Sequence, residues 1–396
     1  MNVISKTVYN PSKNNKMKRL FLLSGFFLLG FIVYGQQAEK VYSIIRVQKN
    51  HAYYSQQAAL WEKELQKSPT DTEAWFNFYT AARMINILAS ESGARFDINA
   101  IAEDLKANIP NTFEYHYVSF ARGNMSREAY EHLQKAYTID PERYETWDAF
   151  ITKAALEGDD KAMKTFFEKW YRHELYSPGI TSWNYNVLIG LDSDALILTF
   201  GDNDTYPLWF LQQVKNIRTD VKVLNTSLLL HPPYQNSVFK ELGIPAFEKT
   251  MEETGDYQEY RDAVMEHILK NTNRPAYIGI STPQSFRKKH DDQLFLIGLA
   301  FKYSDQEFDH VAVIRKNYEH LFLKDYLKTN LTNDFSQSVV DYMDQQYIPC
   351  LSVLYKHYLL SGEASKYLEV RDLLVQIGEK NQMQTDIQNF LAKFKH

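Results

Sequence analysis

The stretch Ala195–Val214 restricts the fold of this chain more than any other segment of its length. It reads ALILTF, then GDND, then TYPLWFLQQV. The uninterrupted apolar run Ala195–Phe200 predicts a strand buried on both faces, as in a parallel sheet. Thr205 is suited to the N-cap of a following helix, and Pro207 to its first turn. We therefore expect a strand, loop and helix of an α/β domain, with the loop at the strand end where ligands usually bind.

Further apolar runs extend this pattern along the chain. Strands are expected at 221–225, 276–280 and 311–314, and the helices between them include 257–271 and 293–301. Residues 179–332 therefore predict an α/β domain with a mostly parallel sheet of about four or five strands. Residues 333–396 predict a helical hairpin that packs on this domain as a cap.

Residues 37–178 have the pattern of consecutive amphipathic helices separated by prolines. Pro69, Pro110 and Pro141 each follow one helical stretch and precede another. The residues that match a helix-hairpin repeat are Trp75, Phe113, Phe120, Ala129, Leu133, Ala136 and Trp147. This region resembles tetratricopeptide repeats, and a plain helical bundle is the alternative. The resemblance implies a concave face that binds a protein or peptide partner.

The first 35 residues have the charge and length of a secretory signal peptide. Lys16, Lys18 and Arg19 precede the mostly apolar, uncharged run Leu20–Tyr34, which falls short of the ~20 residues that a membrane-spanning helix needs. We expect a periplasmic or secreted protein, which is not an integral membrane protein unless the signal stays uncleaved as an anchor. The single cysteine, Cys350, forms no intrachain disulfide and gives no cysteine-based metal site.

Several classes of function lack their usual sequence signals. The net charge of −5 comes without a long basic run, so no nucleic-acid partner is expected. The chain has no phosphate loop, dinucleotide fingerprint, nucleophile elbow or zinc-binding histidine pair. We therefore expect no cofactor, no bound metal and no catalytic residue.

Candidate ligand-binding residues lie beside the predicted strands. They are Asp202, Asn203, Asp204, Thr205, Arg218, Asp220, Asn225, Ser281 and Thr282. The carboxylates and amide of the GDND loop are suited to a sugar's hydroxyls, a cationic group or a divalent cation, although a cation needs more ligands than this loop supplies. A purely structural turn explains the same residues. Arg218 and Asp220, just before the second strand, are expected to pair with each other.

The run Thr199–Leu229 also resembles a block in a known family. The matching elements are Gly201–Thr205, Pro207–Trp209, Arg218–Val221, Asn225, Ser227–Leu229 and, later, Gly298–Phe301. They are similar to the soluble C-terminal portion of bacterial polytopic membrane proteins related to protein O-mannosyltransferases. The resemblance covers roughly residues 184–377 and implies α/β and helical-repeat architecture, an extracytoplasmic setting and an association with envelope glycosylation. Those proteins carry a many-helix membrane domain upstream, where this chain has a signal peptide and helices, so glycosyltransferase activity is not carried over.

Three functions follow as hypotheses. The first is an exported, non-enzymatic binding or accessory protein of the cell envelope, in which the helices bind a protein partner and the GDND crevice binds a glycan. The second is a hydrolase or transferase acting on envelope sugars, with Asp202 or Asp204 as acid, base or metal ligand. The third is a structural periplasmic scaffold.

Overall fold

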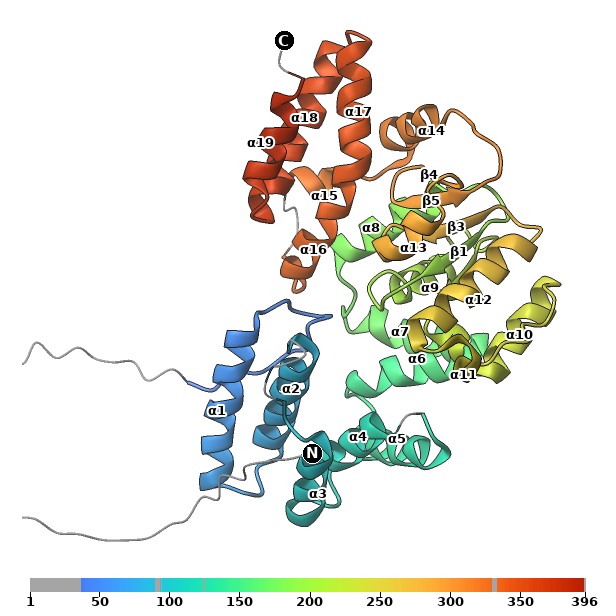
Figure 1. Ribbon diagram of the computed structural model, residues 1–396. Coiled ribbons are helices and arrows are strands. Elements are labelled where there is room, and N and C mark those ends of the chain that lie inside the picture. The colour runs from blue at the N-terminus through green and yellow to red at the C-terminus, as the bar shows by residue number, and fades with distance from the viewer. Residues whose placement is uncertain (1–36, 90–92, 94, 124, 330–332, 395–396) are drawn as a thin grey trace, which may run out of the picture. The chain divides into compact units, whose positions relative to one another are not determined.

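Helices make up most of the described chain, and one small sheet lies in its second half (Figure 1). The computed structural model describes residues 37–89, 93, 95–123, 125–329 and 333–394. The predicted signal peptide at 1–35 lies outside these residues. Contacts divide the chain into Met1–Gln37 and Ala38–His396, and the description below concerns the second unit.

The first part of this unit is helical. Its helices are α1 (His51–Lys67), α2 (Thr72–Leu88), α3 (Ile98–Asn108), α4 (Phe113–Arg122), α5 (Arg127–Ile139), α6 (Glu145–Glu157) and α7 (Asp160–Arg172). Helices α1 and α2, α4 and α5, and α6 and α7 pack together as consecutive pairs. The expected helical hairpins are therefore present.

Two tryptophans show a repeated feature within these pairs. The indole N–H of Trp75 donates to the carbonyl of Pro69 at 2.8 Å, and that of Trp147 donates to the carbonyl of Pro141 at 3.0 Å. The same six-residue spacing thus produces the same hydrogen bond twice. The assignment to tetratricopeptide repeats specifically stays a prediction.

Small residues allow the α4–α5 pair to approach closely. Ala129, Leu133 and Ala136 on α5 are buried. A Cβ added at Gly123 would lie only 2.5 Å from the Cβ of Ala129. This contact agrees with the expectation that small side chains at these positions let two helices pack closely.

The second part contains the sheet and the helices that cover it. In chain order its elements are α8 (Pro178–Ile189), β1 (Leu196–Thr199), α9 (Tyr206–Gln213), β2 (Lys222–Asn225), the 3₁₀ turn η1 (Leu228–Leu230), α10 (Pro232–Leu242), α11 (Met251–Thr254), α12 (Tyr257–Asn271), β3 (Ala276–Gly279), α13 (Gln284–Lys289), β4 (Leu294–Leu296), β5 (Ala300–Tyr303), α14 (His310–Lys316) and the π-helical turn η2 (Asn317–Leu321). The first three strands lie where the apolar runs predict them.

The sheet is mixed, so the expectation of a mostly parallel sheet is wrong. The strand order is β2-β1-β3-β5-β4. β1 pairs in parallel with β2 and β3, whereas β5 is antiparallel to both β3 and β4. The antiparallel half arises because β4 and β5 form a hairpin. Gly298 in its turn has φ +133°, and a Cβ there would lie 2.8 Å from the ring of Phe322, so glycine suits this position.

Two further predictions are wrong in this region. Residues 293–301, expected to be helical, contain β4 and the start of β5, and residues 311–314, expected to be a strand, lie inside α14. An apolar run of four residues does not distinguish a strand from a buried helical turn. The side chain of Asp309 accepts a hydrogen bond from the amide of Ala312 at 2.9 Å. Asp309 therefore caps the N-terminus of α14, which favours a helix over a strand at these residues.

Alternate residues of the central strands face two different cores, as a doubly covered sheet requires. Leu196, Leu198 and Ile278 belong to one core, together with residues of α10, α12 and α13. Ile197 and Tyr277 belong to the other core, together with residues of α8, α9 and α14. Helices therefore cover both faces of the sheet.

The remaining helices follow the sheet in sequence. They are α15 (Asp325–Lys328), α16 (Gln337–Asp344), the 3₁₀ turn η3 (Gln345–Tyr347), α17 (Ile348–Leu360), α18 (Ala364–Lys380) and α19 (Gln384–Ala392). Helices α17 and α18 pack against each other, as the expected hairpin requires. None of the helices in the described ranges combines the length and hydrophobicity needed to span a bilayer.

Candidate functional site

The loops after β1 and β3 are joined by the buried side chain of Asp204. Its carboxylate accepts hydrogen bonds from the amides of Phe200 at 3.1 Å and Gly201 at 2.6 Å, and from the hydroxyl of Ser281. Because β1 and β3 are parallel, their carboxyl ends meet at one edge of the sheet. The structure thus brings Asp204 and Ser281 together, but their polar groups bond to each other and to the loop itself.

Thr205 and Asn225 form a second internal contact at this edge. The amide of Asn225 donates to the hydroxyl of Thr205 at 3.0 Å, and that hydroxyl donates to the carbonyl of Gly201 at 2.6 Å. Thr205 occupies the N-cap position of α9 as predicted, but its side chain makes no capping hydrogen bond there. Both residues hold the loops rather than face a ligand.

Three other candidates make no side-chain hydrogen bond to this cluster within the described residues. Thr282 is buried, and its hydroxyl has no hydrogen-bond partner among the described residues. Arg218 and Asp220 lie before β2, at the opposite end of the strands, where the guanidinium pairs with the carboxylate at 2.9 Å as predicted. Neither Arg218 nor Asp220 belongs to the site.

Asp202 and Asn203, in contrast, turn toward the helical part. The side-chain amide of Asn203 donates to the carbonyl of Ile45 at 3.1 Å. Ile45 belongs to the segment 41–49, which contains a turn at 44–46 and which we call the strap. Asp202, Asn203 and the strap line a cavity of about 170 Å³. We call it the Asp202 cavity.

A fixed ion pair forms part of the cavity wall. The strap residue Arg46 contacts Asp148 of α6 at 3.3 Å and donates to the carbonyl of Leu175 at 3.0 Å. The indole of Trp170 donates to Asp148 at 3.0 Å. Burial raises the pKa of the Asp148 carboxyl, although Arg46 and Trp170 oppose this shift. Asp148 is therefore held in place by partners on two sides.

A second aspartate and arginine in the cavity, Asp202 and Arg83, do not form an ion pair, unlike Arg46 and Asp148. Asp202 and Arg83 of α2 are both exposed at the cavity surface. They are close enough for their charges to interact, yet across the residues that the structure describes they share no ion pair, and the Asp202 carboxylate accepts no hydrogen bond. Desolvation, with repulsion from Asp148 and Asp204, raises the pKa of Asp202 to about 6.

Aromatic side chains provide part of the remaining wall. Tyr117, Trp170, Tyr206 and Phe210 line the cavity. The hydroxyl of Tyr206 lies 2.5 Å from that of Thr152, and burial raises the pKa of the phenol well above its ordinary value. The cavity therefore combines flat apolar surfaces with a few charged and hydroxyl groups, which is the usual composition of a small-molecule site.

The sequence pattern indicates only part of this site. It included Asp202 and Asn203 but not Arg46, Arg83 or Asp148. These three residues come from the strap, α2 and α6, and each sits in a pattern shared by many surface residues of helical proteins. The nearest signal was Trp147, a predicted repeat position beside Asp148.

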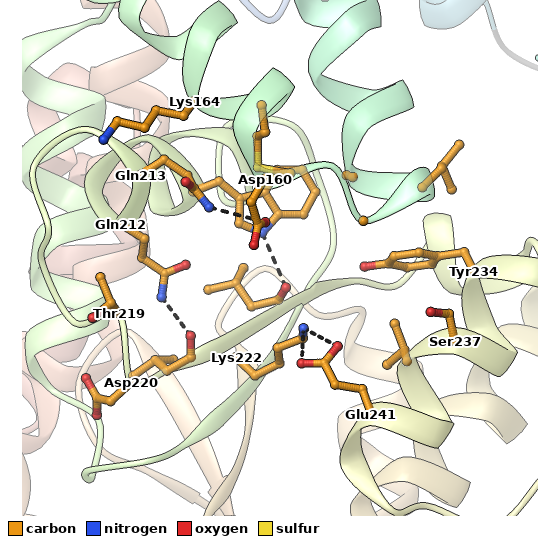
Figure 2. Close-up of a pocket in the computed structure, with 18 of the residues that line it drawn as sticks. Asp160, Lys164, Gln212, Gln213, Thr219, Asp220, Lys222, Tyr234, Ser237 and Glu241 are labelled. Atoms are coloured by element: carbon orange, nitrogen blue, oxygen red, sulfur yellow. Dashed lines mark hydrogen bonds and ion pairs between the residues drawn. The ribbon is translucent and has the colours of Figure 1, made fainter.

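A separate groove runs along the outer edge of β2, as Figure 2 shows. Its volume is about 460 Å³. Lys222 pairs with Glu241 at 2.6 Å, and the side-chain amide of Gln212 donates to the carbonyl of Val221 at 2.7 Å (Figure 2). The Lys222 ammonium and the Val221 carbonyl therefore already have partners, and the groove is a weaker candidate than the Asp202 cavity.

The residues do not gather into a metal centre. No group of three or more His, Cys, Asp or Glu suited to a metal ion occurs within the described ranges. The arrangement at Asp202 is instead suited to a polar organic ligand, because the Asp202 carboxylate and the Arg83 guanidinium do not pair with each other.

The fold and cavity define a mixed α/β domain that is joined to helical hairpins and has a polar, aromatic-walled cavity beside its first strand. Residues 180–388 match the family described as TMEM260-associated domain 2. The match covers just over half of the chain, and the chain belongs to this family. It agrees with the resemblance to the C-terminal region of O-mannosyltransferase-related proteins. No curated protein matches the chain.

Proposed function

We propose that this chain is an exported, non-enzymatic accessory protein of the cell envelope that binds a glycan in the Asp202 cavity. The observation that carries the proposal is the separation of Asp202 from Arg83 in a cavity walled by aromatic side chains. Family membership adds an association with glycosyltransferase-related proteins.

The chemistry of the two charged groups favours a hydroxyl-bearing ligand. An ionised carboxylate only accepts hydrogen bonds, and a guanidinium only donates them. A hydroxyl group does both, so one sugar hydroxyl can donate to Asp202 while it accepts from Arg83. Hydrogen bonds to charged groups are worth about 1.5–3 kcal/mol, and the apolar faces of sugar rings pack on flat side chains such as Tyr117.

The helical pairs support the second part of the proposal, a protein or peptide partner. Stacked helix pairs present extended surfaces that proteins use to bind segments of other proteins. Truncated variants are unsuitable for this test because the strap and α6 contribute to the cavity. Exchange of exposed residues on α1–α5 in the full chain is the appropriate approach, with capture of envelope proteins as the readout.

A glycan array tests the ligand class directly. The purified protein, without residues 1–35, is applied to immobilised neutral, acidic and amino sugars as monomers and oligomers. We expect binding that Asp202→Asn and Arg83→Gln each reduce at least about tenfold, or 1.4 kcal/mol. Asp291→Asn, an exposed acid outside the cavity, is the matched control and keeps full binding. Absence of binding to every sugar, or equal binding by all variants, contradicts the proposal.

One observation favours a second candidate, hydrolysis of a glycosidic bond. Asp148 and Asp202 line the same cavity, and the pKa of each carboxyl is raised. Glycosidases use two carboxyl groups, one of them a general acid with a raised pKa. In this pair Asp148 takes the place of Asp204, because the carboxylate of Asp204 is already bonded to its own loop and to Ser281. Release of new reducing ends from a bound oligosaccharide, lost in Asp202→Asn, would support hydrolysis over simple binding.

A further inference from the structure

A second cavity adjoins the Asp202 cavity. Its volume is about 200 Å³, compared with about 170 Å³ for the first. Both are smaller than the ~300 Å³ at which pockets for drug-sized ligands begin. Each exceeds many-fold the ~10–15 Å³ that a cavity needs to hold one water molecule. Each cavity therefore has room for one small ring with polar substituents.

The two cavities share one wall. The residues that line both are Ile45, Arg46, Arg83, Tyr117, Asp148 and Asp202. Beyond this shared wall, the first cavity extends to Trp170, Thr181 and Tyr206, whereas the second extends to Phe76, Thr80 and Tyr144. We call these the α8 lobe and the α2 lobe, after the helices that carry Thr181 and Thr80.

The charged groups of the shared wall are of two kinds. Arg46 and Asp148 are fixed to each other at 3.3 Å, and Arg46 also lies over the rings of Tyr144 and Trp170, one from each lobe. Arg83 and Asp202 remain apart, and both face the two lobes. The two charged groups that are not joined to each other thus lie at the junction, not at the far end of either lobe.

Aromatic side chains occur on both sides of that junction. The α8 lobe has Trp170 and Tyr206, and the α2 lobe has Phe76 and Tyr144. Two ring-sized spaces, each with aromatic walls, flank one polar junction. A ligand with two linked rings and hydroxyls near the linkage complements this order, whereas a single ring would leave one lobe unused.

We infer that the site binds two linked sugar units of a glycan, one in each lobe, with the hydroxyls beside the glycosidic linkage held between Asp202 and Arg83. This inference rests on the proposed function and specifies its ligand as a disaccharide unit. The Arg46–Asp148 pair separates the two rings at their edges and positions the linkage.

Obstruction of each lobe tests the inference. Thr181→Trp fills part of the α8 lobe, and Ile87→Trp fills part of the α2 lobe, where Ile87 is 55% exposed. Ile139→Trp is the matched control, because Ile139 is 48% exposed and lines neither lobe. Calorimetric titration compares, for each variant, a disaccharide taken from the strongest array signal with its constituent monosaccharide. Thermal unfolding checks that each variant is folded.

We expect the unmodified chain to bind the disaccharide at least about tenfold tighter than the monosaccharide. Either obstructing variant should reduce this gain below about threefold, while Ile139→Trp keeps it. Equal affinity for the two sugars, or a gain that survives obstruction of either lobe, overturns the inference but leaves glycan binding in place. Failure of every sugar to bind overturns the proposed function as well.

Discussion

Arg218 and Asp220, which lie before β2, have an environment opposite to that of Arg83 and Asp202 in the cavity. Arg218 donates to the carbonyls of Leu188 at 2.7 Å and Leu191 at 2.9 Å, and it also pairs with Asp220. That pairing lowers the pKa of Asp220 well below its ordinary value. Arg83 and Asp202 share no such contact within the described chain, and the pKa of Asp202 is raised to about 6.

The difference distinguishes a structural ion pair from the two charged residues that we propose bind a ligand. Charged groups taken from water normally acquire partners, because an unpaired charge in a desolvated place is costly. Arg218 and Asp220 meet this requirement inside the protein. We propose that Asp202 gains its partner from a ligand, whereas Arg218 and Asp220 have a structural role.

The largest expected effect concerns the two arginines. Arg218→Ala should lower the free energy of unfolding by about 3 kcal/mol, because several carbonyls lose a charged donor. Arg83→Ala should lower it by less than about 1 kcal/mol, since Arg83 is exposed and lacks those contacts. Urea unfolding at pH 7 measures both. Similar losses for the two variants would remove the distinction between the pairs.

The two aspartates of the GDND loop should also differ in how much each contributes to the free energy of unfolding. Asp204→Ala should cost about 2 kcal/mol of stability, because two backbone amides and Ser281 lose their acceptor. Asp202→Ala should change stability by no more than about 0.5 kcal/mol. The same unfolding experiment gives both values. A large loss for Asp202→Ala would mean that Asp202 also holds the loop.

Ligand affinity should depend on pH through Asp202. With a pKa of about 6, its carboxylate is mostly ionised at pH 7 and mostly protonated at pH 5. Affinity for the array-selected sugar should therefore fall about tenfold over this range. Asp148 also titrates in this cavity, so the comparison with Asp202→Asn is essential. Calorimetric titration of that variant should show a much smaller change of affinity between pH 7 and pH 5. An unchanged pH dependence would mean that a group other than Asp202 causes it.

The smallest effect concerns the stability of the free protein. The pKa of Asp202 is higher in the folded state, about 6, than its value of about 3.9 in an unfolded chain. The folded state therefore binds more protons between these pH values, and stability falls as pH rises through them. Asp202→Asn removes this loss. Because the side chain is exposed, the variant should gain less than about 1 kcal/mol at pH 8 and nothing at pH 3.5, measured by urea unfolding.

The strands that were predicted correctly have the least ambiguous pattern. Residues 196–199 and 276–279 are apolar at nearly every position and form the central strands β1 and β3, and the buried residues 223 and 224 mark the edge strand β2 beside them. The β4–β5 hairpin was missed because its residues are only half buried, so their pattern is weaker. The mixed sheet follows from that hairpin.

The candidate site was predicted only where local sequence determines it. The GDND loop follows a strand, so its position at the sheet edge could be inferred. Arg83 and Asp148 reach the same cavity only through the packing of α2 and α6 against that loop, and nothing local to either residue indicates this. Likewise, Asp202 and Asp204 have the same side chain two positions apart, and only the three-dimensional contacts show which one is free.

The strap has a consequence for the order in which the molecule assembles. Its residue Gln48 donates a backbone hydrogen bond to the hydroxyl of Ser338, 290 positions later, at 2.9 Å. Asn203 contacts the strap from 158 positions away. During synthesis the strap therefore emerges long before the residues it packs on, and the complete cavity forms only after nearly all of the chain has left the ribosome. We expect cavity formation to be a late step of folding, limited by the closure of this long loop.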